Sequence, residues 1–171
     1  VSHNGKCWMD RNLGASQVAT AFNDSASYGD LFQWGRLDDG HQNRNSNSTD
    51  VLSASDNPGH NMFIVNSSSP YDWRNPSNND LWGTSGVNNP CPNGWRVPTM
   101  QEWGVEMNSW SQQNYNGAYS SPLKLTAAGS RRMSDALIFS TGDFGFYYSR
   151  TVSGSYSFHL QFDYGWAASD I

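Results

Sequence analysis

The sequence predicts an α+β domain of short helices, an antiparallel sheet and long irregular loops, formed by residues 1–171 as one unit. Three observations predict this fold class. A helix start signal occurs near residue 99, and apolar and polar residues alternate strictly between residues 156 and 163. Residues 38–61 are almost wholly polar, as expected of a long surface loop. A length of 171 residues favours a single domain.

The composition indicates an aromatic core. Leu, Ile, Val and Phe together number 28, while Trp, Tyr and Phe number 8 each. Few aliphatic residues would favour disorder only together with a high net charge, and here the net charge is −5. Disordered chains are also poor in aromatic residues. The 25 Ser and 18 Asn residues favour turns over long helices or strands.

Two elements are predicted in the first part of the chain. Residues 7–14 have the pattern of an extended segment that ends in a turn. Residues 28–35 carry Tyr, Leu, Phe and Gly with the i, i+3, i+4, i+7 spacing of a short helix packed on the core.

The second long loop, residues 67–93, differs from the first by its aromatic residues. We expect these aromatic side chains to hold the loop against the body of the domain. They are Tyr71, Trp73 and Trp82.

The clearest local signal is a capping box at Thr99 and Glu102. In this T-x-x-E pattern the Thr side chain accepts from the amide of the third helical residue, whose Glu side chain accepts from the Thr amide. The helix is expected to run to about Asn108. Its buried face would carry Trp103, Met107 and Trp110.

The C-terminal part has the pattern of a strand meander. Alternation over residues 123–127, a short apolar run at 136–139 and aromatic residues over 144–148 predict successive strands. Between residues 156 and 163 one face is aromatic or aliphatic and the other is polar, which is typical of a half-buried antiparallel strand.

Several classes of protein are disfavoured. No apolar run approaches the length of a membrane helix, so we expect no membrane insertion in this segment, and no N-terminal leader is recognisable. Lys and Arg total 10 against 15 Asp and Glu, which gives no basic surface for nucleic acid. The sequence contains no nucleophile elbow, HExxH or P-loop motif, so we expect no enzyme activity, with a pair of Asp residues as the remaining catalytic alternative.

One loop carries a candidate calcium site, and no other cofactor is expected. Oxygen ligands suit this hard cation. The pattern departs from an EF-hand loop, and a solvated loop is the alternative interpretation. The principal candidate ligands are Asp38, Asp39, Asn43 and Asn45, followed by Asn47 and Asp50.

The two cysteines, Cys7 and Cys91, are expected to form a disulfide bond, with two free thiols as the alternative. Neither lies in a CxxC pair or a zinc-like cluster. A disulfide would place the protein outside the cytosol.

Four motifs follow one another along the chain. They are CWMDRNLG at 7–14, YGDLFQWGR at 28–36, NPCPNGWRVPT at 89–99 with Glu102-Trp103, and LKL at 123–125 with Ala128-Gly129 and Arg131. In this order and spacing they resemble the Fibrobacter succinogenes major paralogous domain (FISUMP). The resemblance covers about residues 7–165 and implies a C-type-lectin-like fold in an extracellular or cell-surface bacterial protein, a group that includes lipoproteins and pilin-like proteins. Its fold would lie in the branch shared with formylglycine-generating enzymes and retroelement-diversified receptor-binding proteins.

The chain departs from the family pattern at two places. It has Tyr-Tyr-Ser-Arg at 147–150 where the family often has Tyr-Trp-Ser-Ser. It stops at Asp170-Ile171, about where a final Gly-x-x-Val-Arg-Cys strand is expected to begin, so we expect that strand to be missing. The cysteine of that strand is an alternative partner for Cys91.

The resemblance also implies a contact face, because the sheet and adjoining loops of lectin-like folds commonly form the ligand face. Side chains opposite the apolar face are the candidates, with a plain polar sheet surface as the alternative. Aromatic, amide and hydroxyl groups suit a glycan or protein partner. The candidates are Tyr147, His159, Gln161, Asp163, Tyr164 and Trp166.

The function expected from these observations is a non-catalytic adhesive or structural head of a surface protein or pilus-like filament. Its partners would be a glycan or protein on a surface, or neighbouring copies in an assembly. A phage or retroelement-diversified receptor-binding protein is the first alternative. An enzyme of the formylglycine-generating group is the second, although no cysteine follows Cys91 to serve its chemistry.

Overall fold

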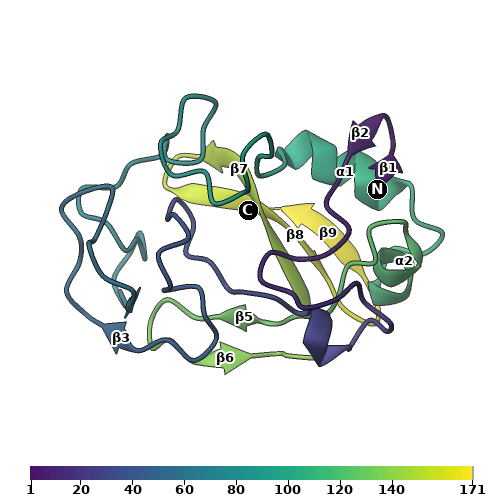
Figure 1. The fold of residues 1–171 in the computed structure, drawn as a ribbon, viewed down its shortest axis with the longest axis horizontal. Coiled ribbons are helices and arrows are strands. Elements are labelled where there is room, and N and C mark those ends of the chain that lie inside the picture. Colours follow the sequence, from purple (N-terminus) through teal and green to yellow (C-terminus); the bar gives the residue numbers. More distant parts are fainter. Residues whose placement is uncertain (171) are drawn as a thin grey trace.

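The largest sheet lies in the last quarter of the chain. In the computed structural model, which describes residues 1–170, strands β7 (Gly145–Ser153), β8 (Tyr156–Phe162) and β9 (Ala167–Asp170) are antiparallel and adjacent in that order. Figure 1 shows them together near the centre of the molecule. Two strands of the predicted C-terminal meander are confirmed, because β7 and β8 contain the strands expected at 144–148 and from residue 156 onward.

Cross-strand pairing fixes which face of the sheet each side chain occupies. Tyr147 lies opposite Leu160 and Tyr148 opposite His159. Directly paired residues share a face, so Tyr147 belongs to the buried face of Leu160, and Tyr148 belongs to the other face. Gly145 pairs with Phe162, where a Cβ would lie 2.2 Å from the Phe162 ring. Glycine is therefore required at this position for the ring to cross the strand.

Helix α1 (Met100–Asn108) begins at the predicted capping box. The Thr99 hydroxyl accepts from the Glu102 amide at 3.2 Å, and the Glu102 carboxylate accepts from the Thr99 amide at 2.8 Å. Helix α2 (Tyr115–Ser120), which the sequence patterns did not predict, starts where the Asn114 side chain accepts from two backbone amides.

Both helices cover the buried face of the sheet and form the main hydrophobic core. Trp103 and Trp110 are buried, and Met107 packs against them, as predicted. The buried members of this core are Trp103, Trp110, Ala118, Leu123, Leu125, Leu160 and Phe162. Aromatic rings thus provide much of the burial, as the composition indicates.

The remaining strands are only two residues long. The antiparallel pairs are β1 (Ser2–His3) with β2 (Lys6–Cys7) and β5 (Ser130–Arg131) with β6 (Ile138–Phe139), and the parallel pair is β3 (Ser48–Thr49) with β4 (Phe63–Ile64). A 3-10 turn, η1, covers Ser25–Ser27. The fold class is therefore α+β, with few helices and several small sheets.

Two predicted elements do not form. Residues 28–35 are not helical, because Gly29 and Gly35 adopt positive φ angles and the amide of Leu31 donates to the distant Gln42 carbonyl. Residues 123–127 form no strand, since Lys124 also has a positive φ, yet Leu123, Leu125 and Ala127 are buried.

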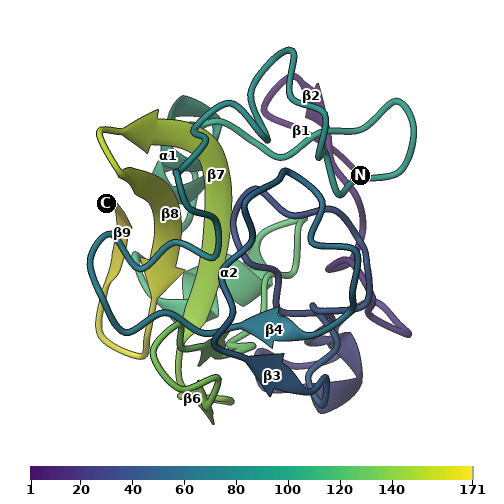
Figure 2. The same cartoon turned by 90° about the vertical axis from the view of Figure 1, so that its left-hand side faces the viewer.

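Residues 28–98, here called the loop region, lie mainly on the side of β7 away from β8 and β9 (Figures 1 and 2). The second core cluster lies here and contains Ile64, Trp73 and Leu81. Trp73 and Trp82 are buried, which confirms that they hold the long loop against the body, whereas Tyr71 is exposed.

Arg36 is the most extensively bonded side chain of the loop region. It is fully buried and donates to the Asp39 carboxylate, to the Gln33 side chain and to the carbonyls of Met62 and His60, at 2.6–3.1 Å. The side-chain amide of Gln33 in turn accepts from the backbone N–H of Ile64 and donates to its C=O. Polar side chains thus replace strand pairing in this region.

No helix within residues 1–170 has the length and apolar character that a transmembrane span requires.

Candidate functional site

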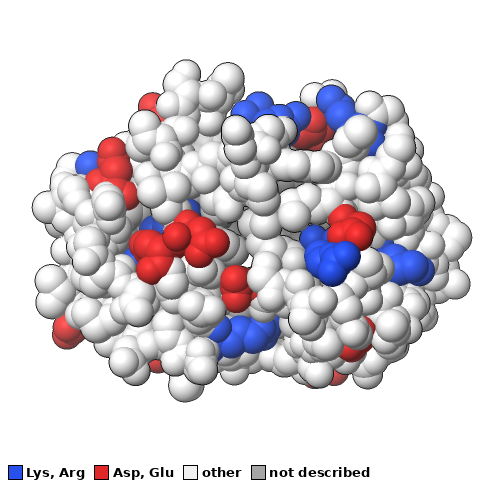
Figure 3. Space-filling view, in the orientation of Figure 1, with Lys and Arg blue, Asp and Glu red and all other residues white. Residues whose placement is uncertain are grey.

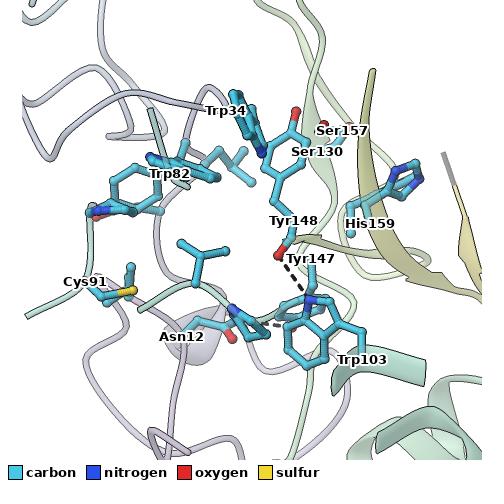
Figure 4. A pocket seen from close by; sticks show the side chains of 18 of the residues that line it. Asn12, Trp34, Trp82, Cys91, Trp103, Ser130, Tyr147, Tyr148, Ser157 and His159 are labelled. Carbon is cyan, nitrogen blue, oxygen red and sulfur yellow. Dashed lines mark hydrogen bonds between the residues drawn. The ribbon is translucent and has the colours of Figure 1, made fainter. Parts of the chain in front are cut away.

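A cavity of about 590 Å³ lies between the sheet, the N-terminal segment and the loop region. It is lined by Trp103 and by parts of residues 7–13, 28–34, 70–98, 123–133 and 146–159, and its walls are mostly apolar and rich in aromatic side chains. Figure 4 shows Trp34, Trp82, Trp103 and Tyr148 around its open centre. A cavity of this size with mostly apolar walls and a few polar groups is typical of a small-molecule site.

Tryptophan dominates this cavity. Six of the eight Trp residues of the chain line it: Trp8, Trp34, Trp73, Trp82, Trp95 and Trp103. Some of these rings also contact one another, with centroid distances of 5.2 Å between Trp8 and Trp103 and 5.5 Å between Trp34 and Trp82. Such contacts hold the walls in place.

Five of the six indole N–H groups donate to main-chain carbonyls. The acceptors are the carbonyl oxygens of His3, Ser149, Trp34, Arg36 and Tyr148, at 2.7–3.3 Å. Each bond fixes the orientation of its ring before any ligand arrives, which lowers the entropic cost of binding. Trp95 makes no such bond within the described residues and is 38% exposed, so it forms the accessible rim.

Tyr148 projects into the cavity. Its ring lies 6.0 Å from the Trp82 ring, edge to face. Desolvation raises the pKa of the Tyr148 phenol, and the residue keeps 38% exposure. No residue in 1–170 hydrogen-bonds the Tyr148 hydroxyl, which is therefore available to a ligand.

Asp30 supplies a carboxylate to the same cavity. Burial raises the pKa of Asp30, and the nearby Asp38 carboxylate raises it further, while Arg44 opposes this. Two further polar side chains, His159 and Ser157, lie near Tyr148 (Figure 4). The site thus combines aromatic faces with a small number of hydrogen-bonding groups.

The prediction that Tyr147 faces outward is wrong. Its ring stacks on Phe162 at 5.8 Å, and its hydroxyl donates to the Thr126 carbonyl and accepts from the Asn12 amide. Desolvation raises the pKa of Tyr147, and the bonds to Thr126 and Asn12 oppose that effect. Tyr147 therefore joins the N-terminal segment to the core.

The prediction that Asp163 lies on the outward contact face is also wrong. It is buried, and its carboxylate accepts from the amides of Gly165 and Trp166 at 2.7 and 3.0 Å, so it stabilises the turn after β8. This turn exposes Tyr164 and Trp166. Both residues, and the partly buried Gln161, lie outside the cavity wall, whereas His159 belongs to it.

Two of the candidate calcium ligands, Asp38 and Asp39, are bonded within the loop itself. The Asp39 carboxylate binds Arg36 at 2.6 Å and the His41 ring at 2.6 Å, so both its oxygens are engaged. Asp38 accepts from the Gln42 side chain, while Asn43 and Asn45 are exposed. Within residues 1–170, no three His, Cys, Asp or Glu side chains are grouped as a metal site.

Cys7 and Cys91 are free cysteines, so the predicted disulfide is not formed in the structure. Both line the cavity, Cys7 on the exposed strand β2 and Cys91 partly buried. Burial raises the pKa of the Cys91 thiol to about 11, which keeps it protonated and unreactive at neutral pH.

The cavity residues that the patterns did not identify are chiefly tryptophans. Trp8, Trp34, Trp95 and Trp103 all lie within the four motifs, yet among them only Trp103 is buried. The number of tryptophans was the one sequence signal for this cavity, because eight Trp residues are many for a 171-residue chain with small cores. Comparisons with family models, with curated proteins and with solved structures gave no match to this chain.

Proposed function

We propose that this chain is a non-catalytic module of an extracellular or cell-surface bacterial protein, and that it binds a glycan in the aromatic cavity. The observation that carries the proposal is the set of six tryptophans around one cavity, five of them fixed through their N–H groups. Flat aromatic faces contact the C–H faces of sugars, and the Tyr148 hydroxyl and the Asp30 carboxylate supply partners for sugar hydroxyls.

The surroundings of His41 and Asp39, the two residues that most resemble a catalytic pair, support a binding role. His41 is fully buried, and its Nε2 accepts from the backbone N–H of Gln33 at 2.9 Å. Burial lowers the pKa of His41. The His41–Asp39 pair is therefore closed to a substrate. The resemblance to the FISUMP domain and its C-type-lectin-like fold supports the extracellular location.

A glycan array followed by calorimetry on the bound glycan tests the proposal. Trp95→Ala should weaken binding about tenfold or more, as truncation of an aromatic anchor does. Trp166→Ala is the matched control, because Trp166 is similarly exposed (41% against 38%) but lies outside the cavity. Absence of any glycan binding, or equal binding by both variants and wild type, would contradict the proposal.

A second candidate function, assembly with neighbouring copies, is favoured by an aromatic patch outside the core. Phe139, Phe146, Phe144 and Trp166 form a continuous series of ring contacts at 5.8–6.4 Å. Phe139 and Trp166 are 40% and 41% exposed, and exposed apolar patches mark interaction surfaces. Light scattering over a concentration series would detect assembly, which Trp166→Ser should weaken and Trp95→Ser should not.

A further inference from the structure

Asp30 is held at the junction of two cavities. It lines the aromatic cavity and also a neighbouring cavity of about 600 Å³ formed by residues 9–15, 37–38 and 89–92 with Phe32. Its amide donates to the Leu13 carbonyl at 2.9 Å, which fixes the backbone. A Cβ at Gly14 would lie 2.2 Å from Asp30 Oδ2, so the glycine makes room for the carboxylate.

The Asp30 carboxylate has no hydrogen-bond or ion-pair partner within residues 1–170. The nearby basic groups direct their hydrogen bonds elsewhere, although the charge of Arg44 still attracts the Asp30 carboxylate. Arg44 donates to the carbonyls of Gly29 and Ala128, and Arg11 pairs with Asp10 at 2.8 Å. A partly buried carboxylate without a cation is unfavourable and gains most from a positively charged partner.

The other basic residues of the aromatic cavity also direct their hydrogen bonds to groups other than Asp30. Arg96 binds Glu102 through two bonds at 2.6 and 2.7 Å. Arg131 donates to the Ala136 carbonyl, the Asn43 carbonyl and Ser46. None of these basic groups bonds the Asp30 carboxylate within the described residues, and Figure 3 shows both acidic and basic side chains beside the central hollow of this face.

The aromatic walls add to this preference. An indole whose N–H is already bonded presents its π face, and π faces attract cations when water is excluded. The remaining acidic residue of the wall, Asp72, has one oxygen engaged by the Arg74 amide at 3.1 Å. Asp30 is thus the acidic group best placed to receive a positive ligand atom.

We propose that the glycan carries an unacetylated amino sugar, whose ammonium group binds the Asp30 carboxylate in the aromatic cavity. This inference rests on the proposed function and adds the charge of the ligand to it. An ammonium–carboxylate contact is stronger than a hydroxyl–carboxylate contact, because both partners are charged. Neutral sugars of the same length would bind the same walls without that contact.

The experiment compares a glucosamine tetrasaccharide with its N-acetylated counterpart by calorimetry, at a pH at which the amines are protonated. Wild type should bind the cationic oligomer about tenfold more tightly. Asp30→Asn should remove that preference, so that the variant binds the two oligomers with equal affinity. Asp50→Asn, the same change at an exposed residue outside both cavities, should retain the preference.

A salt titration on wild type gives a second reading that does not depend on a variant. Binding of the cationic oligomer should weaken with ionic strength, and binding of the neutral oligomer should not. Equal affinity for the two oligomers, or a preference for the acetylated one, overturns the amine inference and leaves glycan binding intact. Failure of both to bind, together with an empty glycan array, overturns the proposed function itself.

Discussion

The loop region and residues 99–170, here called the sheet region, satisfy the same physical requirement in different ways. In the sheet region, backbone groups pair along β7, β8 and β9, and helices cover one face. In the loop region only β3 and β4 form a strand pair, and side chains such as Gln33 and Arg36 bind main-chain groups instead. Order without regular structure therefore depends on a few polar side chains that each make many bonds.

The largest effect is expected where one such side chain is removed. Arg36→Ala leaves Asp39 Oδ2 and two carbonyls without the bonds from Arg36, so the free energy of unfolding should fall by about 4 kcal/mol. Urea denaturation measures this. Arg132→Ala, which removes an exposed pair with Asp135, is the control and should leave the transition in place. Equal transitions for the two variants would refute the role assigned to Arg36.

A smaller effect is expected when a buried aliphatic side chain of the sheet region is truncated. Leu160 lies on β8 and is fully buried in the main hydrophobic core. Leu160→Ala should lower the free energy of unfolding by about 3 kcal/mol. Leu137→Ala, at a residue that is 60% exposed, should change stability by less than about 0.5 kcal/mol. If Leu160→Ala proved more damaging than Arg36→Ala, the sheet region would be the more vulnerable of the two.

Glu102 tests the connection between the two regions. Its carboxylate accepts two hydrogen bonds from Arg96, near the end of the loop region, and one from the Thr99 amide. The bond from Arg96 is the main cause that lowers the pKa of Glu102 from 4.5 to about 2. Because the folded-state pKa is lower, this stabilisation is fully present above pH 4.5 and is lost as the pH falls toward 2.

Measuring unfolding free energy against pH for wild type and Glu102→Gln should show a smaller acid dependence in the variant over that range. Asp50→Asn serves as the control for a change in net charge, and its curve should parallel that of wild type. Parallel curves for wild type and Glu102→Gln would show that the Arg96–Glu102 pair contributes nothing to folding.

Local signals predicted the fold where neighbouring residues decide it. The T-x-x-E pattern located the start of α1, and the polar–apolar alternation of β8 identified a half-buried strand. The strand β7 was harder, because residues 144–148 read Phe-Gly-Phe-Tyr-Tyr and offer no polar contrast. Pairing with β8 decides that Tyr147 faces inward, and pairing is a long-range property.

The candidate site was less predictable than the fold for a related reason. A tryptophan in a core and one in a cavity wall have the same chemistry, and only the arrangement of distant segments distinguishes them. Trp8, Trp34 and Trp95 come from three separate segments and meet only in the folded chain. Asp30 carried no signal, because an acidic residue beside a glycine is typical of an ordinary turn.

The indole bonds of the cavity have a consequence for mutational tolerance. All five acceptors are main-chain carbonyls, and a substitution that keeps the backbone path keeps its carbonyl. Side chains between the tryptophans, such as Ser130 and Ser157, are therefore free to diverge while the ring positions persist. A library randomised at such positions would vary ligand preference on an unchanged scaffold.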